Sequence, residues 1–86
     1  MYLYLGENVI VYEDDVIGIF DLDNTTVSKS TRDFLSNAEK NKTLVNITNE
    51  LPKSFVLCDR DNSIVTYLAQ LSTGTLAQRA ARSVIG

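Results

Sequence analysis

Two aspartates, Asp21 and Asp23, are the residues of this 86-residue chain whose type and spacing most directly allow chemistry. They lie at the end of the apolar run of residues 16–22 and are followed by Asn24 and Thr25. Two carboxylates at the end of a strand can act as nucleophile and general acid–base, while a magnesium ion neutralises the charge of a phosphate. The pattern therefore makes phosphoryl chemistry one hypothesis.

The stretch of residues 19–25 resembles the first motif of the haloacid-dehalogenase-type phosphatases. That resemblance implies a parallel sheet, a distant lysine and a second acidic pair that holds the metal. Too few residues follow position 25 to build such a fold, and the later acidic pair, Asp59 and Asp61, falls in a predicted hairpin turn. In the alternative interpretation, Asp21 and Asp23 end a strand and help to start a helix. The phosphatase hypothesis ranks third of three.

Length and composition predict one small folded domain, residues 1–86. Hydrophobic residues make up 44% of the chain and charged residues 22%, which is usual for a soluble globular protein. The only cysteine, Cys58, cannot form an internal disulfide, and the sequence has no histidine. No membrane-spanning run or signal peptide is visible, so we expect a cytoplasmic protein. We predict no catalytic, cofactor-binding or metal-binding residue.

Charge is distributed unevenly along the chain. The net charge is −3, which argues against bulk affinity for nucleic acid. Residues 1–27 hold six acids and no base, whereas residues 28–86 hold eight bases and five acids. A local basic face can coexist with an acidic total because salt screens each patch. The alternative interpretation is that these are scattered, solvated charges.

Three short strands are predicted in the first part of the chain, at residues 1–5, 9–12 and 16–22. Tight links between them favour an antiparallel meander. The first and third strands carry large apolar residues on both pleat faces. We therefore expect one face of the sheet to meet a helix of the same chain and the other to need a second cover, such as another subunit.

A helix is predicted over residues 28–40. Its apolar stripe includes Phe34, Leu35 and Ala38, and Lys29 and Arg32 face away from that stripe. Ser30 and Asp33 have the spacing of a capping box, and the alternative N-caps are Asn24, Thr25, Thr26 and Ser28. Residues 43–48 could be a short strand or an extended loop.

The second half predicts a hairpin and a final helix. Residues 54–58 and 63–69 read as strands joined by the turn-forming residues 59–62. The helix spans residues 72–84, with Ser72 or Thr73 as its cap. Arg79 and Arg82 lie three residues apart on its polar side, and Lys53 follows Pro52 just before the hairpin.

Four segments in order resemble the bacterial extracellular-matrix regulator family (RemA/RemB-like), and in particular its RemB-like branch. They are residues 2–6, 19–27, 51–56 and 71–80. The resemblance implies a regulator of biofilm matrix genes, and the RemA branch forms rings that bind DNA and activate transcription. That branch carries paired arginines just before the strand that corresponds to residues 54–58. Here the stretch is Glu50-Leu51-Pro52-Lys53, so only Lys53 corresponds to a phosphate contact.

We therefore predict an α+β domain with a small antiparallel sheet and two helices, assembled into a homo-oligomer of which a ring is one form. The leading hypothesis is a non-enzymatic transcriptional regulator that binds DNA phosphates, with no membrane partner and no small-molecule substrate. The expected DNA contacts are Lys53, Arg32, Lys29, Arg79 and Arg82. The alternative is a protein–protein regulator or scaffold of the same fold, binding through the acidic region 13–23.

Overall fold

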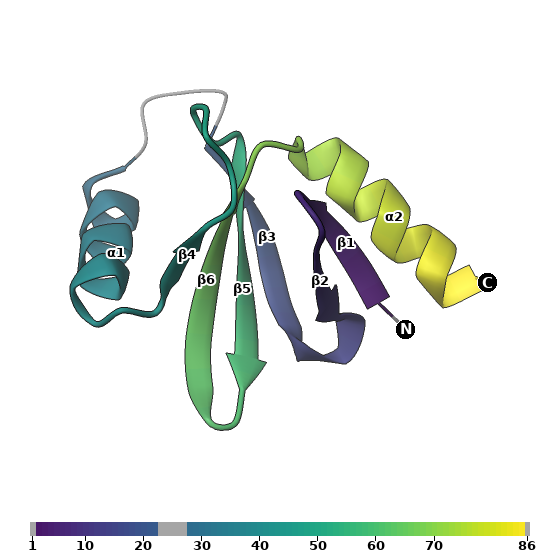
Figure 1. Cartoon of the computed structure of the whole chain (residues 1–86), viewed down its shortest axis with the longest axis horizontal. Coiled ribbons are helices and arrows are strands. Elements are labelled where there is room, and N and C mark those ends of the chain that lie inside the picture. Colours follow the sequence, from purple (N-terminus) through teal and green to yellow (C-terminus); the bar gives the residue numbers. More distant parts are fainter. Residues whose placement is uncertain (1, 23–27, 86) are drawn as a thin grey trace.

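The computed structural model describes residues 2–22 and 28–85, with side chains as far as residue 79. Strands β3 (Val16–Asp21), β5 (Ser54–Arg60), β6 (Ser63–Ala69) and β4 (Leu44–Asn46) form a four-stranded sheet in that order. Strands β1 (Tyr2–Gly6) and β2 (Val9–Tyr12) form a separate two-stranded sheet. Helix α1 (Lys29–Lys40) lies at one end of the molecule and helix α2 (Thr73–Ile85) at the other (Figure 1). The α+β prediction is confirmed.

Both hairpins turn through two residues with positive φ. Asp61 and Asn62 have φ values of 53° and 65° between paired Arg60 and Ser63. Glu7 and Asn8, at 49° and 64°, do the same between β1 and β2. Such turns match the right-handed twist of the strands that they join, and Asn and Asp tolerate this backbone region better than most residues. The hairpin predicted for residues 54–69 is confirmed.

The predicted meander is wrong, because β3 does not pair with β2. A short 3₁₀ turn, η1 (Glu13–Asp15), carries the chain away from the first hairpin, and β3 then pairs antiparallel with β5. Phe20 stacks on Phe55 with ring centroids 4.9 Å apart. This arrangement frees the hairpin to pack as a separate layer, which buries Leu3 and Leu5 to 1% exposure. The rule that strands joined by short links pair with each other does not predict this burial of Leu3 and Leu5.

Residues 44–46 form a strand rather than an extended loop, and this strand runs parallel to β6. The sheet is therefore mixed, although its other pairings are antiparallel as predicted. Two backbone hydrogen bonds extend the parallel pairing beyond the strand, from Thr66 N to Thr43 O at 2.9 Å and from Ile47 N to Leu68 O at 3.3 Å.

Ser28 is the N-cap of α1, since its Oγ accepts a hydrogen bond from Thr31 N at 3.2 Å. The capping box predicted at Ser30 and Asp33 is wrong, because Asp33 pairs with Lys29 instead. The other candidate caps, residues 24–26, and Val27 lie outside the described residues. Ser72 caps α2 by accepting from Thr75 N at 3.2 Å, as one of the two predicted choices.

Helix α1 ends in a Schellman motif, the paired hydrogen bonds that close many helices at their C-terminus. Thr43 N donates to Ala38 O at 2.9 Å, and Lys42 N donates to Glu39 O at 3.1 Å. This motif requires a left-handed residue, and Lys42 occupies that position with a φ of 61°. The chain then turns directly into β4.

The main core lies between the four-stranded sheet, the first hairpin and α2. It consists of Leu3, Leu5, Val11, Val56, Cys58, Ala69 and Leu76. On the opposite face of the sheet, α1 supplies a partial cover, with Phe34 and Phe55 ring centroids 6.4 Å apart. The chain itself therefore provides a cover for each face, where the sequence led us to expect one from another subunit.

We predict that Leu76→Ala lowers the free energy of unfolding by about 2–5 kcal/mol, because Leu76 is 0% exposed and the truncation leaves a cavity. Leu51→Ala is the matched control, since Leu51 is 88% exposed and should cost less than about 0.5 kcal/mol. Urea denaturation of the two variants measures both values. Equal losses would contradict this account of the core.

Candidate functional site

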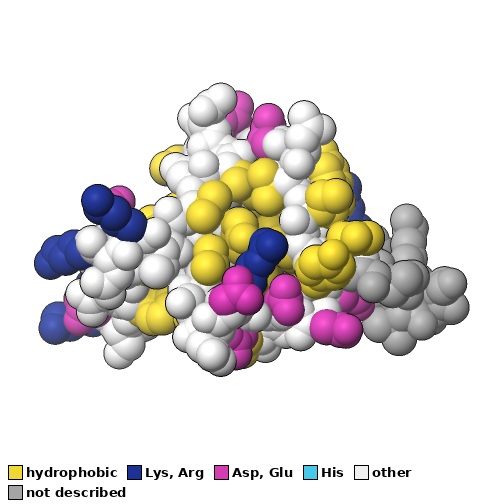
Figure 2. All heavy atoms as spheres, turned by 60° about the horizontal axis from the view of Figure 1, so that its bottom comes forward, with side chains coloured by type: hydrophobic (Ala, Val, Ile, Leu, Met, Phe, Trp, Pro, Cys, Tyr) yellow, Lys and Arg dark blue, Asp and Glu magenta, His cyan; other side chains and the backbone are white. Residues whose placement is uncertain are grey.

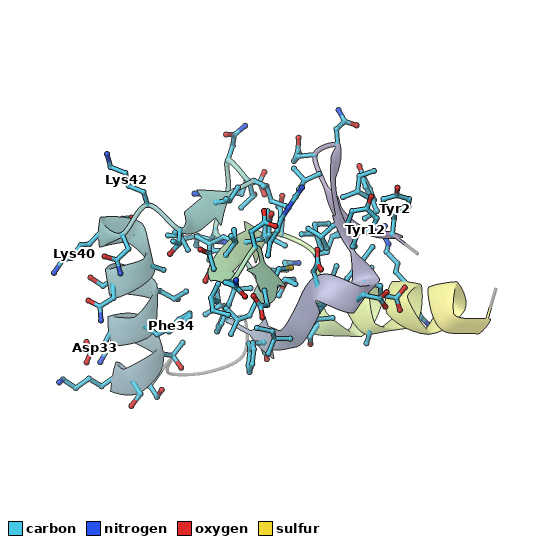
Figure 3. All side chains as sticks on the ribbon, turned by 90° about the horizontal axis from the view of Figure 1, so that it is seen from below. Tyr2, Tyr12, Asp33, Phe34, Lys40 and Lys42 are labelled. Atoms are coloured by element: carbon cyan, nitrogen blue, oxygen red, sulfur yellow. The ribbon has the colours of Figure 1, made fainter. Side chains whose placement is uncertain are left out.

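The α1 end of the molecule carries a cluster of exposed basic side chains, here called the basic end. Figure 2 shows basic side chains gathered at the end where α1 lies. The side chains of Lys40 and Lys42 point away from the sheet, whereas Phe34 points toward it (Figure 3). All the bases of this cluster are exposed: Lys29, Arg32, Lys40 and Lys42. The amphipathic pattern of α1 explains why its basic side chains point outward and Phe34 points inward, because the apolar stripe of the helix packs against the sheet.

One base of this cluster makes an ion pair within the helix. Lys29 Nζ lies 3.5 Å from Asp33 Oδ2, and the two side chains are 84% and 62% exposed. An exposed pair four residues apart stabilises a helix by only about 0.3–0.5 kcal/mol. A stronger anion such as a phosphate could therefore displace Asp33 at small cost.

Lys53 lies just before β5, on a segment held by backbone hydrogen bonds. Its N donates to Ala69 O and its carbonyl accepts from Leu22 N, both at 2.9 Å. The side chain is exposed. Lys53 is thus presented from a fixed backbone, apart from the helix that carries the basic end.

Arg79 interacts with the first hairpin. Its Nη1 donates to Tyr4 O at 3.1 Å, and the guanidinium carbon lies 5.1 Å from the centre of the Tyr4 ring. These contacts fasten α2 to β1. The side chain of Arg82 lies outside the described residues. Of the five predicted DNA contacts, Lys29 and Arg32 therefore share α1, whereas Arg79 lies on α2 at the opposite end of the molecule (Figure 1).

The loop between β4 and β5 is braced by side chains, a feature the sequence analysis missed. Thr48 N donates to Asn46 Oδ1 at 3.1 Å, and Glu50 N donates to Thr48 Oγ1 at 3.1 Å. Gln70 closes the network with hydrogen bonds to Thr48 and Glu50. The sequence does contain a signal for this brace, because Asn and Thr residues favour turns in which their side chains bond to the nearby backbone. Leu51, which directly follows Glu50 of this brace, is 88% exposed.

The first hairpin has an exposed apolar outer face, here called the hairpin face. Tyr2, Tyr4, Ile10 and Tyr12 alternate with the buried residues of the same strands and are 43–58% exposed. The Tyr2 hydroxyl donates to Tyr12 at 3.4 Å, and this hydrogen bond raises the pKa of Tyr2 above its usual 10.0. An apolar patch of this kind often marks an interaction surface.

The acidic pairs that suggested phosphoryl chemistry do not converge. Asp21 ends β3 opposite Ser54, and Asp59 lies five residues farther along β5, roughly 17 Å away at about 3.4 Å per residue. Asp23 lies outside the described residues. Residues 2–22 and 28–85 hold no group of three acidic, cysteine or histidine side chains that could bind a metal.

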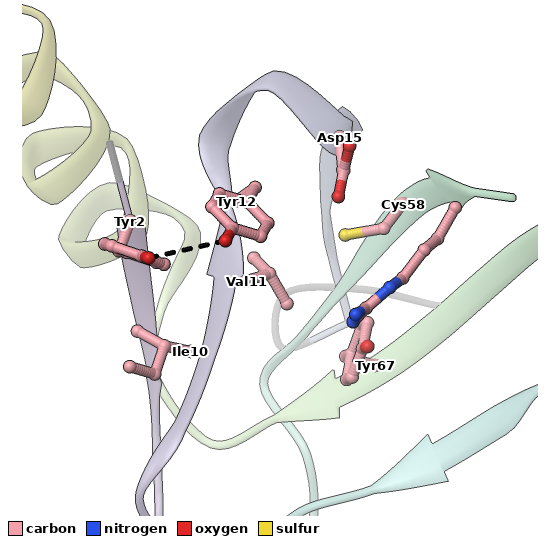
Figure 4. Close-up of a pocket in the computed structure, with 8 residues that line it drawn as sticks. Tyr2, Ile10, Val11, Tyr12, Asp15, Cys58 and Tyr67 are labelled. Atoms are coloured by element: carbon pink, nitrogen blue, oxygen red, sulfur yellow. Dashed lines mark hydrogen bonds between the residues drawn. The ribbon is translucent and has the colours of Figure 1, made fainter.

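A small pocket of about 80 Å³ lies between the first hairpin and strands β5 and β6. Cys58 and Asp15 lie on one side of it, across from the Tyr2–Tyr12 pair (Figure 4). Burial, with a smaller contribution from the negative charge of Asp15, raises the pKa of the Cys58 thiol to about 11. The thiol is therefore protonated at neutral pH and is a poor nucleophile.

Comparison with known proteins adds two findings. The family described as RemA-like, extracellular matrix regulatory protein A-like, matches residues 2–80. The chain is also similar to Extracellular matrix regulatory protein B of Bacillus subtilis (strain 168), at 34% identity over 80 residues, which cover 93% of this chain and 90% of that protein. In the described part of the chain, no helix is long and apolar enough to cross a bilayer.

We predict that Cys58 reacts slowly with thiol reagents at pH 8 until the protein is unfolded. Its raised pKa also means that the folded state holds the thiol proton more tightly than the unfolded state. Stability should therefore fall as pH rises from about 9 to about 11, where only the unfolded thiol ionises. Denaturation across this range, compared with Cys58→Ala, measures the effect. The same pH dependence in both proteins would contradict it.

Proposed function

We propose that this chain, which belongs to the RemA-like family of extracellular matrix regulatory proteins, regulates matrix genes without catalysis by binding DNA phosphates as a homo-oligomer. The observation that carries the DNA proposal is the basic end, where four exposed bases lie on α1 and the residues just after it. Such a surface suits the phosphate backbone of DNA, whose contacts supply most of non-specific affinity.

Self-association is part of this proposal, because one copy offers few phosphate contacts. Linked copies convert later contacts into intramolecular ones, so weak sites add up. The hairpin face supports self-association, since its exposed tyrosines and Ile10 would be covered by a second copy. Lys53 adds to the same phosphate surface in an assembly that brings it beside the basic end of a neighbouring copy.

A second candidate function is a protein–protein regulator that does not touch DNA. It is favoured by the acidic segment η1, which follows directly after the hairpin face. A basic protein partner could cover the apolar face and pair with Asp14 and Asp15 at its edge. The stretch Glu50-Leu51-Pro52-Lys53, where the family resemblance implies paired arginines and this chain has only Lys53, also favours this candidate.

We predict that the protein retards duplex DNA in gel shifts at low salt, with an affinity that falls steeply as salt rises. Replacing Lys40 and Lys42 by Gln should reduce the slope of log affinity against log salt by about 0.9 for each lost phosphate contact in each engaged copy. Arg60→Gln is the control for lost positive charge, because Arg60 lies on β5, away from α1.

Absence of a shift at low salt, at a concentration where sedimentation shows an oligomer, would refute DNA binding and favour the second candidate. A loss of slope per removed charge in Arg60→Gln as large as in the Lys40 and Lys42 variant would instead refute the assignment of the contact to the basic end.

We also predict that Ile10→Lys with Tyr12→Lys shifts the protein toward monomer in sedimentation experiments, raising the dissociation constant roughly 30-fold or more. The reason is that two charges would be buried without partners at the covered hairpin face. Leu51→Lys, an exposed apolar residue elsewhere, should leave the oligomer intact. A wild-type protein that stays monomeric at micromolar concentration would contradict self-association.

A further inference from the structure

Besides the hairpin face, an apolar hollow of about 210 Å³ is exposed on the α1 side of the four-stranded sheet, here called the aromatic hollow. Successive side chains of β5 point to opposite faces, so Val56 and Cys58 lie in the core shared with the first hairpin, whereas Phe55 and Leu57 line the hollow. The sheet therefore separates the aromatic hollow from the hairpin. The residues that line it are Phe20, Phe34, Phe55, Leu57, Ser30 and Thr31.

The aromatic hollow is a preformed recess for a ring. Phe20 is held flat against Phe55, because Gly18 leaves room for it: a Cβ at position 18 would lie 2.8 Å from the Phe20 ring. Phe20 and Phe34 nevertheless remain 42% and 39% exposed. An engineered cavity of about 150 Å³ accepts benzene, so this hollow has space for one aromatic side chain. Rings on three sides also suit the offset and edge-on contacts that aromatic groups prefer.

The hairpin face carries side chains of the kind that this hollow accepts. Tyr4 and Tyr12 are 43% and 50% exposed, and they stand on strands whose opposite side is buried against the core. The same chain thus presents aromatic side chains on the first hairpin and an aromatic recess on the α1 side of the sheet. Figure 1 shows the hairpin and α1 at different ends of the molecule, so a chain cannot fill its own hollow.

The end of the molecule that carries the hairpin is acidic. Residues 2–15 hold four acids and no base. Two bases from other elements lie near the hairpin, but Arg60 stands between Asp59 and Asp61 in the sequence. Arg79 is fastened to the hairpin by its hydrogen bond and ring contact. A partner of this end is therefore expected to bring positive charge.

The opposite end of the molecule meets that requirement. Residues 28–42 hold four bases and two acids. Two hairpin faces in contact would bring Asp14 and Asp15 of both copies together, and two α1 ends would bring their bases together. Like charges across an interface oppose binding, whereas opposite charges steer and orient it. Charge therefore favours contact between the hairpin end of one copy and the α1 end of another.

We propose that the hairpin face of one copy docks in the aromatic hollow of the next, with a tyrosine ring inserted among the phenylalanines. This proposal rests on the self-association in the proposed function and adds which surfaces meet. A head-to-tail contact of this kind repeats from copy to copy, so it closes into a ring or continues as a filament. Lys40 and Lys42 point away from the sheet (Figure 3), so docking in the hollow leaves them available for phosphates.

Two variants of the full chain each block one of the two surfaces. Ile10→Lys with Tyr12→Lys blocks the hairpin face. Ser30→Glu with Thr31→Glu blocks the aromatic hollow by placing acidic charge in its lining, where it would be desolvated and would repel the acidic hairpin end. The second variant should keep α1 stable, because a glutamate three residues after the N-cap Ser28 completes a capping box and suits the helix dipole.

Sedimentation velocity, at a concentration where the parent chain oligomerises, measures the outcome. Each variant alone should be monomeric, with a dissociation constant raised roughly 30-fold or more. An equimolar mixture of the two should form one-to-one dimers that do not grow further, because one variant keeps an intact hollow and the other an intact hairpin face. Ser36→Glu, on an exposed part of α1 outside the hollow, is the control and should oligomerise as the parent does.

A hairpin face that pairs with itself would give a different result. The variant with the blocked hollow would then remain dimeric, and the mixture would contain no mixed dimer; this outcome overturns the head-to-tail contact and leaves self-association intact. A parent chain that stays monomeric overturns both. If circular dichroism shows that the Ser30 and Thr31 variant is unfolded, Ser30→Trp, which fills the hollow without adding charge, takes its place in the same mixing experiment.

Discussion

The need to cover a sheet that is apolar on both faces determines most of this structure. Strand β5 buries Phe55 on one side and Val56 on the other, so neither face can be left to water. Burial of apolar area is the dominant favourable contribution to folding, and a chain of this length has few residues to spare for it. The first hairpin and α2 cover most of one face, where Tyr67 stays half-buried beside the pocket of about 80 Å³, and α1 covers part of the other.

This division of cover explains where the functional features lie. Because the hairpin is a separate layer, its outer strand face is exposed and carries the tyrosines. Because α1 contacts its face of the sheet only in part, a hollow remains beneath the helix, while the bases are turned outward. The same compromise therefore gives an apolar surface at one end and a basic surface at the other.

The sequence predicted elements that local chemistry specifies. Asp61 and Asn62 can adopt the left-handed backbone of a tight turn, so the β5–β6 hairpin was predictable, and Ser28 and Ser72 were recognisable caps. The pairing of β3 with β5 was not predictable from adjacent residues, because contacts distant in sequence decide it. For the candidate site, the helical pattern predicted that Lys29 and Arg32 face away from the apolar stripe, and both are exposed on α1. The fastening of Arg79 to Tyr4 and the braced loop were not predictable, because they depend on tertiary contacts.

The left-handed backbone of Lys42 affects both the stability and the charge of the C-terminal end of α1. The left-handed position of a Schellman motif is usually glycine, and a residue with a Cβ there costs roughly 1–2 kcal/mol. The tight reversal also places an ammonium group at the negative end of the helix dipole, two residues after Lys40. Lys42 therefore adds positive charge at the C-terminus of α1 at the cost of a strained backbone. Glycine at position 42 would relieve that strain, but it would weaken the positive electric field of this surface.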